Sequence, residues 1–142
     1  MIKPDGYPYI GEILEQLMMN DIQISQLKMV KLPYEIASKM GSTEHLTSDV
    51  SIGLEIETTK DPSIFTLIFG VENPKDADKS SIRGKYGKDI HQNIVFFAAS
   101  LQLSQSLISM VFSLPAHCTL DNCTLVLIKP PAIFNRSAGL II

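Results

Sequence analysis

Residues 48–57 constrain the fold more than any other stretch of this sequence, because apolar and polar side chains alternate along them. The apolar positions are Val50, Ile52, Leu54 and Ile56, with polar or small residues between them. A period of two is that of a β-strand with one face against a core and the other toward solvent. The chain is therefore expected to contain a sheet, and its other elements have to cover one face of that sheet.

A second clear pattern, with helical spacing, lies near the start of the chain. Its apolar residues share one helix face and are Ile10, Ile13, Leu14, Leu17 and Met18. Further patterns predict strands at 22–31, 93–99 and 124–129, and helices at 33–40, 61–70 and 101–112. The last of these helices is expected to pack through Leu101, Leu107, Ile108, Val111 and Phe112. This order of elements predicts an α+β domain, in which a ferredoxin-like antiparallel sheet carries helices on one face.

Composition sets limits on the class of protein. The 142 residues include 45% hydrophobic and 19% charged residues, which suits one compact domain, and the net charge of -3 is spread without a Lys/Arg block. A nucleic-acid partner is therefore not expected. The sequence has no apolar run long enough to span a bilayer, so we expect no membrane contact and a cytoplasmic protein. Cys118 and Cys123 are expected to be reduced thiols, and with His117 they lack the fourth ligand of a zinc site.

Four short motifs carry a resemblance to a known family. They are I-K-P-D-G at 2–6 with I-G-E-I at 10–13, G-V-E-N-P at 70–74, S-I-R-G at 81–84 and N-I-V at 93–95. In order and spacing they resemble the nucleoside diphosphate kinase family across most of residues 1–112. The resemblance implies a mechanism in which a histidine takes the γ-phosphoryl group from one nucleotide and passes it to another.

The histidine that this mechanism needs is absent from its place. In the family pattern it lies three residues beyond the asparagine that corresponds to Asn93, and that position is Phe96 here. A phenyl ring has no lone pair to attack phosphorus, so we expect no catalytic residue. His91 lies five residues earlier on the same segment, an odd spacing that in a regular strand places its side chain on the opposite face. His45 and His117 are expected to be solvated surface residues.

The resemblance implies that the nucleotide site is only partly kept. Lys3 and Arg83 match family positions that contact phosphates, and Asn93 matches one that bonds the sugar. Thr66 stands where the family has a second phosphate arginine, and Glu72 stands where it has a phosphate-binding threonine. A carboxylate repels a polyphosphate unless a metal ion intervenes. Lys3 and Arg83 therefore either hold a nucleotide or persist as turn and surface residues.

The family's base-clamping helical hairpin is also missing, since only residues 41–47 connect the predicted helix at 33–40 to the strand at 48–57. That connection contains no Phe or Tyr to stack on a base. Beyond Phe96, the small and acidic residues that usually support the histidine are replaced by Phe97, Ala98 and Ala99.

The end of the chain repeats its beginning. T-L-V-L-I-K-P-P-A at 124–132 repeats the start of the domain, and G-L-I-I at 139–142 is similar to G-E-I-L at 11–14. This resembles two-domain members of the family, and it predicts a degenerate kinase-like domain at 1–112, a linker at 113–123 and a remnant of a second domain at 124–142. We expect strand 124–129 to fill the sheet position left by the short Met1-Ile2 segment, in its own domain or in a neighbouring copy. The alternative is a disordered vestige.

Two functions are open at this point. The first is a catalytically inactive, structural protein, because two-domain relatives of this type are associated with axonemal doublet microtubules of cilia and flagella. That resemblance implies protein partners such as tubulin and other axonemal proteins, self-association, and a place in the cytoskeleton. The second is a nucleotide-binding regulator or weak kinase that uses Lys3, Arg83 and Asn93 with a Mg-nucleotide as its cofactor.

Overall fold

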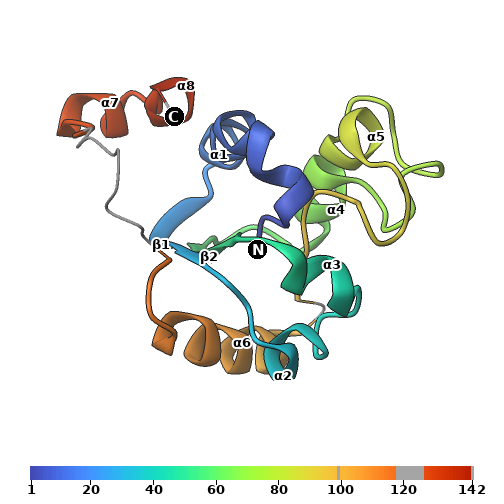
Figure 1. Cartoon of the computed structure of the whole chain (residues 1–142). Coiled ribbons are helices and arrows are strands. Elements are labelled where there is room, and N and C mark those ends of the chain that lie inside the picture. Colours follow the sequence, from blue (N-terminus) through green and yellow to red (C-terminus); the bar gives the residue numbers. More distant parts are fainter. Residues whose placement is uncertain (99, 118–126, 142) are drawn as a thin grey trace.

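The computed structural model describes residues 1–98, 100–117 and 127–141. In chain order the elements are the 3-10 helix η1 (Pro4–Tyr9), α1 (Ile10–Met19), β1 (Gln23–Val30), α2 (Tyr34–Ala37), α3 (Thr43–Ser48), β2 (Ser51–Glu57), α4 (Ser63–Phe69), α5 (Ile82–Tyr86), α6 (Leu101–Ser113), α7 (Pro130–Phe134) and α8 (Ala138–Ile141) (Figure 1). Within the described ranges, no helix has both the length and the apolar character needed to cross a membrane.

The sheet is antiparallel, with β1 paired to β2 from Gln23 opposite Glu57 to Val30 opposite Ser51. The register shifts between Ile24 and Gln26, where the apolar alternation of the sequence slips. Ile2 extends the sheet through isolated antiparallel bridges to Ile52 on one side and Val95 on the other. The order across the sheet is therefore β1, β2, Ile2 and Val95.

The predicted strand at 93–99 is wrong for its described part, because within 93–98 Val95 alone forms a bridge. A ladder needs a paired neighbour, and the described neighbour of this segment is Met1 and Ile2, which pair with Phe96 and Val95. Beyond Phe96 the chain has no paired strand beside it in the described structure, although its apolar residues have the composition of one.

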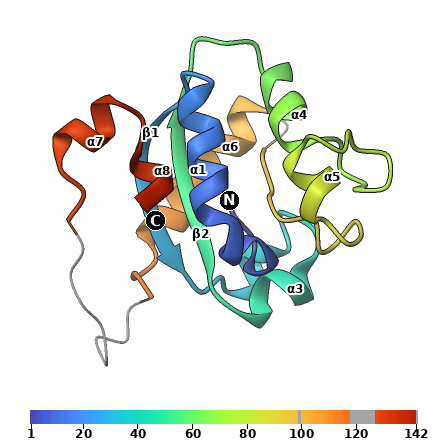
Figure 2. The ribbon, with the colours of Figure 1, turned by 90° about the horizontal axis from the view of Figure 1, so that it is seen from above.

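Helices cover both faces of the sheet, which corrects the expectation of a single covered face. Ile52 is buried in a cluster with residues of α1 and α4, whereas a Cβ on the next residue, Gly53, would lie 2.8 Å from Cγ1 of Val111 on α6. Successive strand residues point to opposite faces, so the two cores lie on opposite sides of β2. Figure 1 shows α1 on one side of the sheet and α2 and α6 on the other, and Figure 2 shows α1 lying along β2.

Several element boundaries differ from the prediction. The strand expected at 48–57 begins at Ser51, because residues 43–48 form α3, whose Leu46 is fully buried. The helix expected at 33–40 ends at Ala37, and Gly41 and Ser42 then reverse the chain with φ angles of 69° and 52°. On α6, Leu107 and Val111 are buried as expected, but Leu101 is 75% exposed because it lies in the first turn, beyond the edge of the core.

The last elements pack on the outside of the domain. Residues 124–126 of the predicted strand lie outside the described residues, as do Cys118 and Cys123, and residues 127–129 form no strand. Leu127 is 76% exposed. Helix α8 contacts α1 so closely that a Cβ on Gly139 would lie 2.7 Å from the carbonyl oxygen of Gly11 (Figure 2). The expected division into a domain, a linker and a remnant stays a prediction.

Candidate functional site

Lys3, Arg83 and Asn93 come together in one cavity, although they are far apart in the sequence. Each is at most 5% exposed, and together they line a cavity of about 280 Å³, which we call the polar pocket. Its lining is Lys3, Met40, Gly41, Ser42, Glu72, Arg83, Ile90, His91, Asn93, Val95 and Phe96. The three positions that the sequence singled out therefore form one site.

The motif at 2–6 and the motif at 93–95 form hydrogen bonds with each other beside this pocket. The backbone N–H of Lys3 donates to the carbonyl of Ile94 over 2.9 Å, and the N–H of Ile94 donates to Oδ2 of Asp5 over 3.0 Å. These bonds hold Ile94 at a φ of 73°, an unfavourable conformation for a β-branched residue. A Cβ at Gly6 would lie 2.5 Å from the Ile94 carbonyl oxygen, so only glycine fits there. Asp5 and Gly6 of the first motif thus fix the backbone of Ile94, two residues before Phe96.

Arg83 is held at the start of α5 by a tight turn. Oγ of Ser81 caps this helix by accepting from Gly84 N at 3.2 Å, and a Cβ on Gly84 would lie 1.9 Å from the Asp78 carbonyl oxygen. The buried guanidinium donates to the carbonyls of Gly70 and Val95, each over 2.9 Å. It therefore ties the end of α4 to the segment that carries Phe96.

Arg83 and Lys3 also face other groups of the protein. The guanidinium carbon of Arg83 lies 5.1 Å from the ring centre of Phe97, a cation–π contact. Nζ of Lys3 donates to the carbonyl of His91 over 3.0 Å, and Nδ2 of Asn93 donates to the carbonyl of Glu72 over 2.8 Å. Nε of Arg83 and Oδ1 of Asn93 are buried with no hydrogen-bond partner among the described residues.

The electrostatics of the pocket follow from two buried cations. Burial is the largest influence on the pKa of Lys3 and lowers it; Asp5 opposes this shift and Arg83 adds to it. Burial also lowers the pKa of Arg83, with Glu72 acting in the opposite direction. Glu72 itself is exposed at the rim. The interior of the pocket therefore favours an anion, while its rim carries a carboxylate.

Phe96 lies between this pocket and a second, apolar one. Its N–H donates to the Met1 carbonyl and its carbonyl accepts from the Met1 ammonium, both over 2.9 Å. The half-buried ring contributes to the walls of both cavities. No atom of that ring can form a bond to phosphorus.

The histidines depart from expectation in two of three cases. His91 lines the polar pocket, because residues 89–92 form a turn in which Oδ1 of Asp89 accepts from His91 N and Gln92 N, each over 2.8 Å. Its Nδ1 lies 3.2 Å from Oγ of Ser42. The prediction of the opposite face was wrong because it assumed a regular strand.

His45 was expected to be solvated, but it is half-buried on α3, and its Nε2 lies 2.7 Å from Oδ1 of Asp5. His117 is exposed. Thr66 is exposed on α4 and lies outside the lining of the pocket. Across the described ranges, His, Cys, Asp and Glu side chains form no group of three or more that could hold a metal ion.

These features define an α+β protein with an antiparallel sheet and a cationic pocket beside Val95, at the edge of that sheet. A family model for nucleoside diphosphate kinase matches residues 1–115, and the chain belongs to that family. Relatives include nucleoside diphosphate kinases of Saccharolobus islandicus, 29% identical over 79% of this chain and 91% of the relative, and of Archaeoglobus fulgidus, 26% identical over 80% and 83%.

Solved structures show the same fold. The nucleoside diphosphate kinase of Aquifex aeolicus superposes with a TM-score of 0.69 at 22% identity, covering 76% of this chain and 88% of that one. A nucleoside diphosphate kinase family protein of Babesia bovis gives a TM-score of 0.70 at 19% identity, covering 79% and 84%. Both likenesses confirm the predicted ferredoxin-like α+β fold.

Proposed function

We propose that this chain is a catalytically inactive member of the family with a structural role. The observation that carries the proposal is Phe96 at the position where the family resemblance places the histidine nucleophile. Transfer through a histidine needs a ring nitrogen whose lone pair forms the P–N bond while the bond from phosphorus to the bridging oxygen breaks. Phe96 supplies no such nitrogen, so this two-step route is closed at that position.

Lys3 and Arg83 form hydrogen bonds within the protein that require no nucleotide. Arg83 bridges two backbone carbonyls from different segments, and Lys3 donates to a third. A buried carbonyl that loses its donor costs about 1–3 kcal/mol, which is sufficient reason to keep these residues. Their presence is therefore compatible with a protein that has given up phosphoryl transfer.

The binding partners that we propose rest on the resemblance to two-domain relatives of the ciliary type. We infer binding to tubulin or other axonemal proteins on doublet microtubules, with a cytoskeletal location. A tagged copy in a flagellated cell should fractionate with salt-washed doublets and remain after detergent extraction. An even cytosolic distribution, together with its absence from the doublet fraction, would argue against this role.

Inactivity is tested directly by labelling. The purified chain is incubated with Mg²⁺ and ATP labelled at the γ-phosphate, beside an active family member, and acid-labile, base-stable label is measured. We expect none on this chain. Label would contradict inactivity, and a His91→Ala variant would then show whether the histidine that lines the polar pocket accepts it.

A second candidate, a nucleotide-binding regulator, is favoured by one observation. The cationic interior of the polar pocket contains Nε of Arg83 and Oδ1 of Asn93 without partners among the described residues. A Mg-nucleotide would present phosphate oxygens to the arginine and sugar hydroxyls to the asparagine. Nucleotide at a hundred times its dissociation constant stabilises a protein by about 2.7 kcal/mol.

Thermal unfolding with millimolar ADP and ATP tests this candidate. Binding predicts a higher melting temperature for the native chain and a smaller shift for Asn93→Ser, which keeps a small polar side chain but removes the amide oxygen. Equal melting temperatures with and without nucleotide would eliminate the regulator and leave the structural role.

A further inference from the structure

The polar pocket contains a buried donor and a buried acceptor that the rest of the protein leaves unpaired. Nε of Arg83 has no acceptor and Oδ1 of Asn93 has no donor among the described residues, although the two side chains are only 5% and 2% exposed. Buried polar groups in folded proteins nearly always have a hydrogen-bond partner. The pair therefore indicates a bound group that brings an acceptor for the arginine and a donor for the asparagine.

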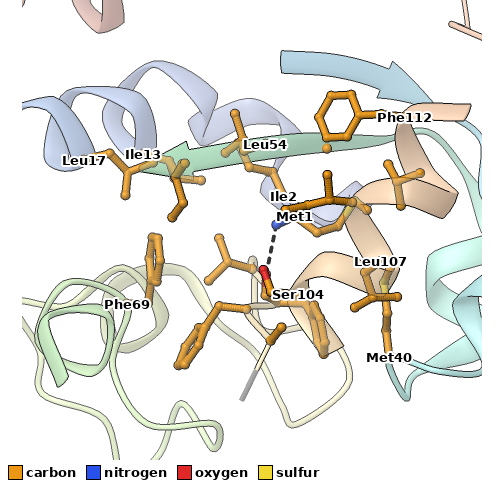
Figure 3. A pocket seen from close by; sticks show the side chains of 18 residues that line it. Met1, Ile2, Ile13, Leu17, Met40, Leu54, Phe69, Ser104, Leu107 and Phe112 are labelled. Carbon is orange, nitrogen blue, oxygen red and sulfur yellow. Dashed lines mark hydrogen bonds between the residues drawn. The ribbon is translucent and has the colours of Figure 1, made fainter. Parts of the chain in front are cut away.

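The second cavity beside Phe96, which we call the apolar pocket, has a different character. It is smaller, with a volume of about 110 Å³, and its walls come from both cores of the domain (Figure 3). Ser104 is the one polar side chain among its described lining residues, and the Met1 ammonium there is already bonded to the Phe96 carbonyl. A specific site needs a few placed polar groups to orient its ligand. Of the two cavities, the polar pocket is therefore the one with the groups that a ligand needs.

The charges around the polar pocket limit what its ligand can carry. Burial is the largest influence on the pKa of Lys3 and of Arg83 and lowers both, and attraction to Glu72 opposes that shift in each case. Asp5 and Asp89 raise the pKa of Lys3 in the same way. Two cations thus lie near three carboxylates, and those carboxylates would repel a polyphosphate that carries several negative charges. A group with a single negative charge matches this balance better.

The free donors of the two cations suit a carboxylate. Nζ of Lys3 carries three N–H groups, of which the His91 carbonyl takes one. The terminal nitrogens of Arg83 donate to two backbone carbonyls, which leaves its Nε–H for a ligand. A carboxylate has two oxygens, one for each cation. An aspartyl residue in a peptide also places its carboxylate close to backbone N–H groups, and one of these would donate to Oδ1 of Asn93.

The size and the rim of the pocket suit a side chain that enters from an extended segment. The volume of about 280 Å³ is below the roughly 300–1,000 Å³ of pockets that enclose a drug-sized ligand. Four of the lining residues are exposed and form the rim, namely Gly41, Glu72, Ile90 and His91. A Cβ added at Gly41 would meet no atom within 4 Å, so the space in front of this residue is open. A peptide backbone would cross the rim there while one acidic side chain reaches the two cations.

We propose that the polar pocket binds the carboxylate of an aspartyl residue in an extended segment of a partner protein. The carboxylate accepts from Nε of Arg83 and Nζ of Lys3, and a backbone N–H of the segment donates to Oδ1 of Asn93. Recognition of acidic motifs by arginine side chains is a recurring mode of peptide binding. This contact rests on the proposed structural role, which requires a protein partner, and it gives that partner one chemical feature.

Capped aspartate, with an acetyl group on its amine and a methylamide on its main-chain carboxyl, is the smallest probe of this contact. It is titrated into the full ¹⁵N-labelled chain at fixed ionic strength and pH, and the Nε–H resonance of Arg83 is followed by NMR. We expect a saturable shift of this resonance. Capped asparagine, which has the same shape without the charge, should give none. Absence of a saturable shift with capped aspartate, as when water satisfies both buried atoms, would overturn the proposal.

Acetate tests whether Asn93 accepts a hydrogen bond from the ligand. It carries the same carboxylate without a backbone N–H, so it should bind at least about threefold more weakly than capped aspartate. In Asn93→Ser, which lacks the amide oxygen, the two affinities should become equal. Equal affinities in the native chain, or a preference that survives in Asn93→Ser, would contradict the assigned contact. If Asn93→Ser fails to fold, the native comparison of acetate with capped aspartate still decides.

Glu72→Gln removes the exposed carboxylate at the rim and tests the charge balance. Capped aspartate should then bind at least about twofold more tightly, whereas Glu57→Gln, at the exposed end of β2, should leave its affinity unchanged. Equal effects of the two substitutions would place the probe outside the pocket and reject the site.

ADP and doublet fractionation separate this contact from the proposed functions. If ADP shifts the Arg83 resonance and capped aspartate does not, the pocket belongs to the nucleotide-binding regulator and the proposal is overturned. A chain that fractionates with doublets but does not bind capped aspartate keeps the structural role and loses this contact. A chain that binds capped aspartate but is absent from doublets supports the carboxylate site and rejects the axonemal role.

Discussion

Phe96 separates two cavities of opposite character. In the polar pocket, buried cations are held by backbone carbonyls, so each charged side chain connects segments of the fold. In the apolar pocket, the side chains are almost all apolar, and burial lowers the pKa of the adjoining Met1 ammonium. The comparison indicates that the charged side chains of the polar pocket help to connect segments of the fold, whereas the apolar pocket is formed by side chains from the two cores.

The largest effect is expected at Arg83. Arg83→Ala leaves the buried carbonyls of Gly70 and Val95 without their donor, at about 1–3 kcal/mol each, and removes the contact with Phe97. Urea unfolding should show a loss of about 2–6 kcal/mol in the free energy of unfolding. Lys85→Ala, on the same helix but bonded only to the partly exposed Glu12, should change it far less. Equal losses would mean that the polar pocket is not a structural connection.

A pH effect of intermediate size is expected from the Met1 ammonium, which adjoins the apolar pocket. Because folding lowers the pKa of the Met1 ammonium from 8.0 to about 5, the unfolded chain binds more protons between these values. Its contribution to stability therefore rises as pH increases from about 5 to 8 and is constant above. The full shift corresponds to on the order of 4 kcal/mol, since one pKa unit is about 1.4 kcal/mol. Lys3, whose pKa is also lowered, works in the same direction at higher pH.

An N-terminally acetylated chain isolates this contribution. Acetylation removes the titrating group, so the difference in free energy of unfolding between the two forms should change across pH 5–8 and be flat above pH 8. Histidines contribute equally to both forms and cancel in that difference. A difference that does not depend on pH would show that the Met1 ammonium is solvated in the folded chain.

The sequence predicted the polar pocket better than the apolar pocket, for a physical reason. Lys3, Arg83 and Asn93 lie in motifs with fixed residue types and spacing, and the structure brings all three together. Periodicity also located the apolar face of α1. Motifs and hydrophobic periodicity each describe a single segment, and they follow from the backbone geometry of that segment.

What the sequence missed depends on partners across the sheet. Residues 93–98 are apolar enough for a strand, but Val95 alone is bridged, because pairing depends on a neighbour that the pattern does not reveal. The same assumption of a regular strand put His91 on the wrong face. Asp5 and His45 form a pair that no local spacing signals, since they are brought together by α3, a helix that was expected to be a connection.

The smallest effect on stability, and the sharpest test of the comparison, is expected from Phe96→His. Loss of half-buried ring carbons between the two cavities should cost about 1–2 kcal/mol, and Phe96→Leu, which keeps an apolar side chain, is the matched control. We expect the new histidine to take no label from ATP, because Thr66 and Glu72 replace two phosphate contacts of the family and Arg83 is already bonded to two carbonyls. Labelling at the rate of an active family member would mean that the polar pocket retains its catalytic environment and that inactivity rests on this single residue. A blank result with intact folding would place the loss in the whole pocket, which is the stronger form of the structural proposal.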